Sequence, residues 1–142
     1  MLIGSYNHQL DAKNRFRIPS KFKKELGENL VVVKGTNKSL FLMSEDNLQT
    51  DVFDKMQNIS MFDETAQKSL RILLSSSHEL ETDNQGRSLL PSNLKEFANI
   101  TKNIVIIGVG RRVEIWAEEE WNKYNEELNF DEEVKNLSGY GV

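Results

Sequence analysis

Apolar positions divide the chain into short segments that follow one another in the same order twice. Residues 2–10 alternate loosely between apolar and polar side chains, which predicts a strand. Phe16 and Ile18 then alternate with Arg15 and Arg17. Side chains of a strand point to its two faces in turn, so this second strand would carry apolar groups on one face and basic groups on the other.

The rest of the first half predicts a short helix, a hairpin and two longer helices. Phe22 and Leu26 lie one helical turn apart within residues 20–26, and Gly27 is placed to end that helix. Ser44 can cap a helix, and a second helix begins near Asp63. The hairpin comprises residues 30–33, 34–38 and 40–43, and the two apolar stripes are Leu48, Val52, Met56 and Ile59, then Ala66, Leu70, Leu73 and Leu74.

The same order of segments returns after residue 77. It predicts strands over residues 78–82 and 87–90, a short helix, a hairpin over 104–116 and a last helix from about Ala117. Residues beyond about 129 are mostly polar, which is typical of a flexible tail. The chain is therefore expected to contain a first unit over residues 1–60, a bridging helix over 61–76, a second unit over 77–129 and a flexible tail over 130–142.

A ten-residue motif recurs 72 residues further along, at positions 11 and 83, and indicates one structural unit built twice. The first copy begins Asp11-Ala-Lys-Asn-Arg15 and the second Asp83-Asn-Gln-Gly-Arg87, and Pro-Ser follows in both. Asn14 and Gly86 occupy the same place, and both residue types tolerate the left-handed backbone of a turn. Each copy thus predicts a strand, an aspartate turn, an arginine-bearing strand and a short helix. Such units suggest a small α+β fold repeated as an internal pseudo-dimer, or else a pair of independent small barrels.

Composition excludes several classes of protein. The 142 residues suit one ordinary domain or two small fused ones. The absence of cysteine excludes disulfides, thiolate zinc sites and cysteine catalysis, and it fits a reducing cytoplasm. No apolar run approaches the roughly 18 residues of a membrane span, and no secretory signal is visible at the first residues. We therefore expect a cytoplasmic protein with no membrane partner.

Charge is distributed unevenly although the net charge is only −4. Residues 11–24 carry six basic side chains against Asp11 alone, whereas residues 114–133 are strongly acidic. Such an asymmetry is a feature of proteins with a polyanion-binding face. Two solvated faces of opposite sign would give the same pattern, so charge alone leaves both interpretations open.

The chain resembles the MraZ family of bacterial proteins over nearly all of its length. Matching segments are Met1-Leu-Ile-Gly4-Ser-Tyr6, Leu10-Asp11-Ala-Lys13-Asn-Arg15 with Pro19, Asp83-Asn-Gln-Gly86-Arg87 with Pro91, and Ile106-Ile-Gly108 followed by Glu114-Ile-Trp116. The resemblance implies an α+β fold, a tandem duplicated AbrB-like swapped-hairpin or double-split β-α-β barrel with bridging helices. It also implies a ring-shaped homo-oligomer that regulates transcription by binding short direct repeats upstream of the division and cell-wall gene cluster.

Arg15 and Arg87 are the principal candidates for contact with double-stranded DNA. A guanidinium presents a planar fork that can bind two acceptors of guanine or a phosphate. The alternative is an arginine that pairs with Asp11 or Asp83 only to hold the turn, and both roles are compatible. The full set of candidate DNA-binding residues is Lys13, Asn14, Arg15, Arg17, Gln85, Gly86 and Arg87.

The first copy is the more basic, so we expect it to dominate DNA affinity. A regulator of this kind needs no cofactor, no metal and no small-molecule substrate, and we expect it in the cytoplasm, associated with the nucleoid. Catalysis is not expected: Glu79 and Asp83 of the alternating acidic run would lie roughly 13 Å apart on a strand, too far to share one cation. The alternative function is an oligomeric scaffold in which the aspartate–arginine turns join subunits.

Overall fold

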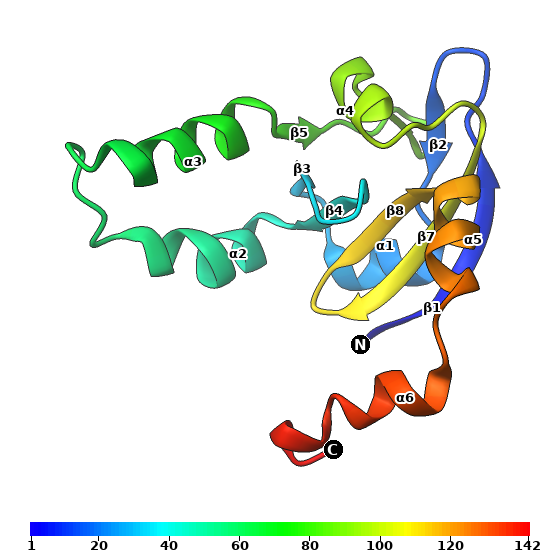
Figure 1. Ribbon diagram of the computed structural model, residues 1–142. Coiled ribbons are helices and arrows are strands. Elements are labelled where there is room, and N and C mark those ends of the chain that lie inside the picture. The colour runs from blue at the N-terminus through cyan, green and yellow to red at the C-terminus, as the bar shows by residue number, and fades with distance from the viewer.

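The computed structural model describes residues 1–142 as two halves that share one sheet (Figure 1). Six antiparallel strands follow the order β1-β7-β8-β4-β3-β5, and β2 and β6 form a separate two-stranded ribbon. The strands are β1 Leu2–Gln9, β2 Arg15–Arg17, β3 Leu30–Lys34, β4 Leu40–Ser44, β5 His78–Leu80, β6 Arg87–Leu89, β7 Asn103–Gly110 and β8 Val113–Ala117. The α-helices are α1 Ser20–Leu26, α2 Glu45–Leu48, α3 Glu64–Ser75, α4 Ser92–Phe97, α5 Glu118–Glu126 and α6 Phe130–Lys135.

The two halves exchange their first strands. β1 of the first half pairs with β7 of the second, with Tyr6 opposite Ile106. In return, β5 of the second half pairs with β3 of the first, with Leu80 opposite Leu30. The ribbon joins β2 to β6, with Phe16 opposite Ser88. Because each half completes its sheet with a strand of the other, the halves are not independent barrels, and that alternative is wrong.

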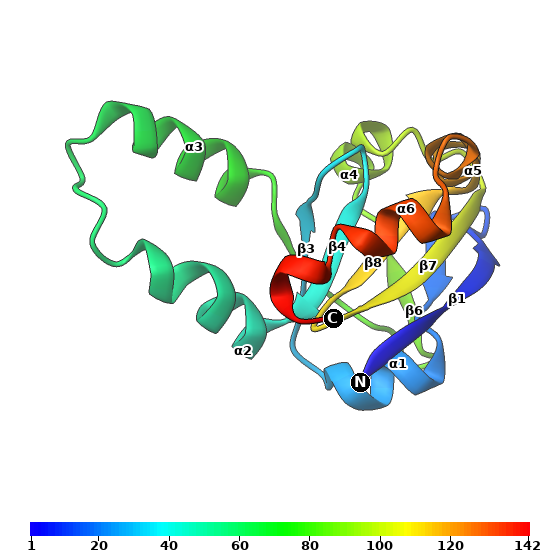
Figure 2. The ribbon, with the colours of Figure 1, turned by 60° about the horizontal axis from the view of Figure 1, so that its bottom comes forward.

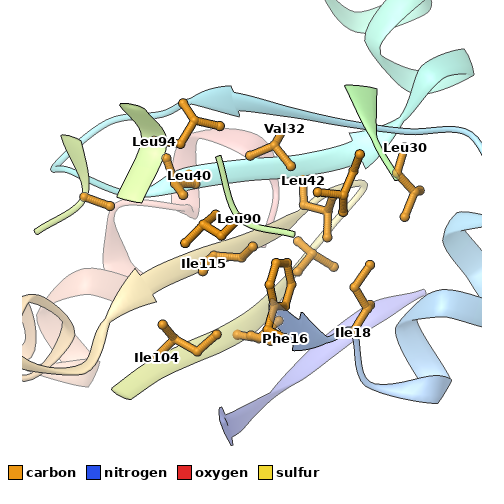
Figure 3. Close-up of a cluster of buried hydrophobic side chains, with 14 of the residues drawn as sticks. Phe16, Ile18, Leu30, Val32, Leu40, Leu42, Leu90, Leu94, Ile104 and Ile115 are labelled. Atoms are coloured by element: carbon orange, nitrogen blue, oxygen red, sulfur yellow. The ribbon is translucent and has the colours of Figure 1, made fainter. Parts of the chain in front are cut away.

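One apolar core spans both halves. Val32 and Leu40 of the first half lie near Leu90 and Leu94 of the second, all fully or almost fully buried (Figure 3). Phe16 adds the inner face of the ribbon to the same cluster. The apolar positions that alternate along the sequence therefore meet in one interior, which fixes the ribbon on the body of the protein.

The linker after Ser44 is helical but changes its winding. Ser44 caps α2 by accepting from the Asn47 N–H at 3.1 Å, as the sequence predicts. A π-helical turn, Gln49–Phe53, and a 3₁₀ turn, Asp54–Met56, then continue the segment. The wider turn lets Val52 and its neighbour Phe53 both pack on a second apolar cluster, which an α-helical stripe alone did not predict.

The linker, residues 45–75 from α2 to α3, projects from the sheet (Figures 1 and 2). We call it the arm. Met61 and Phe62, at the far end of the arm, are 80% and 89% exposed. The C-terminal residues contain α6, which the sequence did not predict; Asn129 caps it by accepting from the Glu132 N–H at 3.1 Å. The mobility of residues 130–142 stays a prediction. None of the helices has the length and apolar character needed to cross a membrane.

Candidate nucleic-acid interface

The first aspartate turn is closed by a single carboxylate. Oδ1 of Asp11 accepts from the backbone N–H groups of Lys13 and Arg15, each at 2.9 Å. Oδ2 accepts from Nε of Arg15 at 2.7 Å. Asn14 completes the turn with a φ of 60°, the left-handed conformation predicted for this position. We call residues 11–15 the first arch.

Residues 83–87 form a second arch with the same bonds. Oδ1 of Asp83 accepts from the N–H groups of Gln85 and Arg87, each at 2.9 Å, and Oδ2 accepts from Nε of Arg87 at 2.9 Å. Gly86 takes the left-handed place with a φ of 78°. The repeated motif thus specifies one local structure twice, down to the oxygen that each donor contacts.

Each arch presents the outer edge of its guanidinium to solvent. The aspartate binds Nε only, which leaves the Nη1 and Nη2 groups of Arg15 and Arg87 without a hydrogen bond within the chain. The two side chains are 25% and 26% exposed. The salt bridge that the sequence suggested is therefore present, and it holds each guanidinium in one orientation with donors remaining for an external acceptor.

The ribbon places three arginines on one face. Arg17 lies directly opposite Arg87, and Arg15 lies opposite Leu89. Phe16 and Ser88, which alternate with them, are buried. Like charges directly opposite on neighbouring strands repel each other, so an anion bound over this face would relieve the repulsion. We call Arg15, Arg17, Arg87 and Leu89 the outer ribbon face.

The other candidate residues differ in how exposed they are and in whether their side chains are hydrogen-bonded. Lys13 and Gln85 are exposed at the tips of the two arches. Asn14 is half-buried, and its Oδ1 accepts from Nζ of Lys95 at 2.8 Å, so its side chain holds the first arch against α4. Gly86 is exposed, and Nη1 of Arg17 donates to the carbonyl of its neighbour Gln85. Leu89, 56% exposed, was missed because its apolar side chain suggested a buried strand position.

Hydrogen bonds to the two aspartates lower their pKa values. For Asp11 the main cause is the backbone N–H of Arg15, with smaller contributions from the Arg15 side chain and the Lys13 N–H; together they outweigh desolvation and hold the pKa below its ordinary 3.8. For Asp83 the corresponding donors are the backbone N–H of Arg87, that of Gln85 and the Arg87 side chain, which lower the pKa in the same way.

Protonation of Asp11 and Asp83 should therefore open the two arches only at low pH. Because the pKa of each carboxyl group is lower in the folded protein, the stabilisation that its ionised form gives to the fold is complete above pH 3.8. It is lost as the pH falls through the folded-state pKa. NMR titration of the side-chain carboxyl carbons should give midpoints below 3.8 for Asp11 and Asp83 in the folded protein. Arg15→Gln should move the Asp11 midpoint upwards and leave that of Asp83 in place. A midpoint for Asp11 that does not respond would contradict the bonding described.

Both arginines of the β7–β8 turn are paired with carboxylates. Arg111 donates through Nε to Asp51 at 2.8 Å, which ties the β7–β8 turn to the arm while the arginine side chain stays 62% exposed. Arg112 pairs with Glu114 at 2.7 Å and covers the ring of Phe41. No three acidic or histidine side chains lie close enough to share a metal ion.

Comparison with known proteins also divides the chain into two parts. A family model described as "MraZ protein, putative antitoxin-like" matches residues 1–72 and again residues 73–138. The chain belongs to the MraZ family. Proteins named as the transcriptional regulator MraZ are similar to it along their whole lengths, with all of both chains covered: 38% identical over 143 residues in Clostridium tetani, 41% over 144 in Alkaliphilus oremlandii and 40% over 144 in Syntrophomonas wolfei.

The two family matches each contain one arch, one ribbon strand and one hairpin. Their boundary, between residues 72 and 73, falls in α3, just before the strand β5 that crosses to the other half. In this MraZ-family chain, duplication in the sequence and strand exchange in the structure together place two copies of the arginine-bearing arch on one ribbon.

Proposed function

We propose that this chain is a sequence-specific DNA-binding transcriptional regulator whose outer ribbon face contacts the DNA. The observation that carries the proposal is the pair of matched arches, each of which orients a guanidinium through Nε and leaves its outer N–H groups to bind an acceptor. A fork held in this way suits the O6 and N7 acceptors of guanine in the major groove. Relatives that match the whole chain are named as transcriptional regulators.

Each candidate residue has a part in this proposal. Arg15 and Arg87 bind base edges, while Lys13 and Arg17 neutralise phosphates on either side. Gln85 lies at the tip of the second arch, where its amide can donate to or accept from a base. Asn14 and Gly86 give the arches their left-handed turn and so act by positioning. The fold that carries them is of the AbrB-like swapped-hairpin type, which the exchange of β1 and β5 supports.

The regulator acts as a ring of several copies in this proposal. Two apolar surfaces lack a partner within the chain: Met61 and Phe62 at the end of the arm, and Phe130 and Tyr140 in the C-terminal segment, all at least 80% exposed. Because the two surfaces differ, contact between them on neighbouring copies is heterologous, and such contacts form a ring when the rotation from one copy to the next closes. A ring presents several ribbons to short direct repeats upstream of the division and cell-wall gene cluster, at the nucleoid.

The direct test is a gel-shift with DNA from upstream of the gene that encodes this chain. We expect the protein to bind this DNA in preference to a shuffled duplex of the same length and base composition. Preference for the native sequence supports the proposal. Equal binding to both duplexes, or binding to neither, would overturn it and favour a structural scaffold.

Lys13 provides a second test because a phosphate contact affects all DNA equally. Lys13→Ala should weaken binding to operator and shuffled DNA by the same factor, and the slope of log Kd against log salt should fall by about one unit. Fluorescence anisotropy over a series of salt concentrations measures both quantities. A variant that loses preference for the operator while its salt slope is unchanged would show that Lys13 contacts a base.

A further inference from the structure

A cavity of about 420 Å³ lies between the two halves, beside the second arch. The first half contributes β1, β2 and α1 to its wall, and the second half contributes the arch and β6. The lining residues that matter here are His8, Arg17, Lys23, Thr82, Gly86 and Ser88. Its volume falls within the range of small-molecule sites.

The equivalent positions of the other half hold apolar side chains. At the 72-residue spacing of the repeat, His8 corresponds to Leu80, Thr82 to Leu10 and Ser88 to Phe16. Leu80, Leu10 and Phe16 are at most 7% exposed and belong to the core. The half-buried His8 and the two hydroxyls thus replace side chains that fill space in the other copy. Forgoing that apolar packing is destabilising, so the cavity is not explained by folding.

The arch beside the cavity also lacks a bridge that the first arch has. Nζ of Lys95 donates to Oδ1 of Asn14 at 2.8 Å and closes the first arch against α4. Gly86 and Lys23 are the corresponding pair, but Gly86 has no side chain to accept. Nζ of Lys23 instead donates to the carbonyl of Gly27 at 2.9 Å. The space between the second arch and α1 therefore stays open.

The positive charge of the cavity lining favours an anionic ligand. Arg17 and Lys23 line the cavity and no carboxylate does, although Glu28 approaches Lys23 to 3.5 Å from outside. Arg17 is held over the second arch by its bond to the Gln85 carbonyl, and its other N–H groups remain available. The hydroxyls of Thr82 and Ser88 bond to each other at 3.0 Å, and either can rotate to donate to an oxyanion.

We propose that this cavity binds a phosphate group. The group belongs to a soluble phosphate ester or to the DNA backbone beside the outer ribbon face; only the second source rests on the proposed function. Binding next to the second arch places the ligand against Arg17, which also faces Arg87 on the ribbon. Occupation of the cavity would thus be coupled to the position of an arginine on the outer ribbon face.

An NMR titration with inorganic phosphate, with sodium chloride at equal ionic strength as reference, tests the site without DNA. We expect saturable shifts of the Gly86 amide and the His8 ring with phosphate only. Gly86→Asn should supply the missing bridge to Lys23, since Asn14 already adopts this backbone, and Arg17→Gln removes a cation. Each should weaken phosphate binding about tenfold or more. Lys95→Gln, at the equivalent lysine of the other half, should leave it unchanged.

Shifts that match those with chloride, or that survive both Gly86→Asn and Arg17→Gln, would overturn the proposal. The source of the phosphate follows from adding a shuffled DNA duplex. If the duplex displaces inorganic phosphate from the cavity, as reported by the His8 ring, the backbone is the ligand. If it does not, the ligand is a soluble ester. Failure of operator recognition would leave the phosphate titration unaffected, so the two proposals fail separately.

Discussion

Arg15→Ala should abolish specific binding to operator DNA. A guanidinium that binds one guanine through two hydrogen bonds discriminates against other bases by about 1–3 kcal/mol, which corresponds to roughly 5- to 150-fold in affinity. In an assembly that contacts several DNA repeats the loss recurs at each contact, so the specific complex should disappear from a gel-shift assay. Arg87→Ala should have the smaller effect, because the second arch has fewer basic neighbours.

Two variants distinguish loss of the planar guanidinium donors from loss of positive charge. Arg15→Lys keeps a cation but not the planar pair of donors, so it should bind all DNA without preference. Lys21→Ala removes a cation from the exposed face of α1 and should leave operator binding intact. If Arg15→Ala folds and still prefers its operator, Arg15 does not read bases.

Phe62→Asp should dissociate the proposed ring and weaken binding to DNA that carries several repeats. The side chain is 89% exposed at the end of the arm, so a charge there costs the single chain little but opposes an apolar contact between copies. Loss of multivalency should reduce affinity for the repeated operator by about 10²–10⁴-fold, while affinity for a single repeat is unchanged. Light scattering gives the mass and fluorescence anisotropy the two affinities.

Val109→Asp is the matched control for this prediction. Val109 is also apolar and 41% exposed, but it lies near the end of β7, on the sheet. Arg111, close to it in sequence, contacts the arm at Asp51 and not at the far end that carries Phe62. It should leave both mass and affinity unchanged. A Phe62→Asp protein that keeps its mass would place the subunit contact elsewhere on the surface.

Local features of the site could be predicted because a few neighbouring residues determine them. Asp11 and Arg15 are four positions apart, so one carboxylate can bind both the backbone and the side chain of the arginine. The left-handed backbone conformation in each arch was predicted from the residue types of Asn14 and Gly86. The helix cap at Ser44 was predicted because this serine precedes a run of apolar residues with helical spacing. Each of these depends on contacts within about five residues, and the sequence shows such contacts directly.

Features that depend on pairing between the halves could not be predicted. The positions of Arg17 and Arg87 in the sequence give no sign that the two face each other, since β2 could have paired with any exposed strand edge. The same holds for the 420 Å³ cavity, whose walls come from both halves. Helix α6 was missed because residues beyond 129 are mostly polar, and Leu89 was missed because an apolar side chain in a strand suggests burial, yet it is 56% exposed.

The most direct test of the arginine arches is the NMR spectrum of the arginine side chains with and without the operator. Nε–H signals of Arg15 and Arg87 should be visible in the free protein, because the aspartates hold them. On addition of operator DNA, the Nη groups of both arginines should sharpen and shift, and those of Arg111, paired with Asp51, should not. Operator binding that leaves the Nη signals of both Arg15 and Arg87 unchanged would contradict the account.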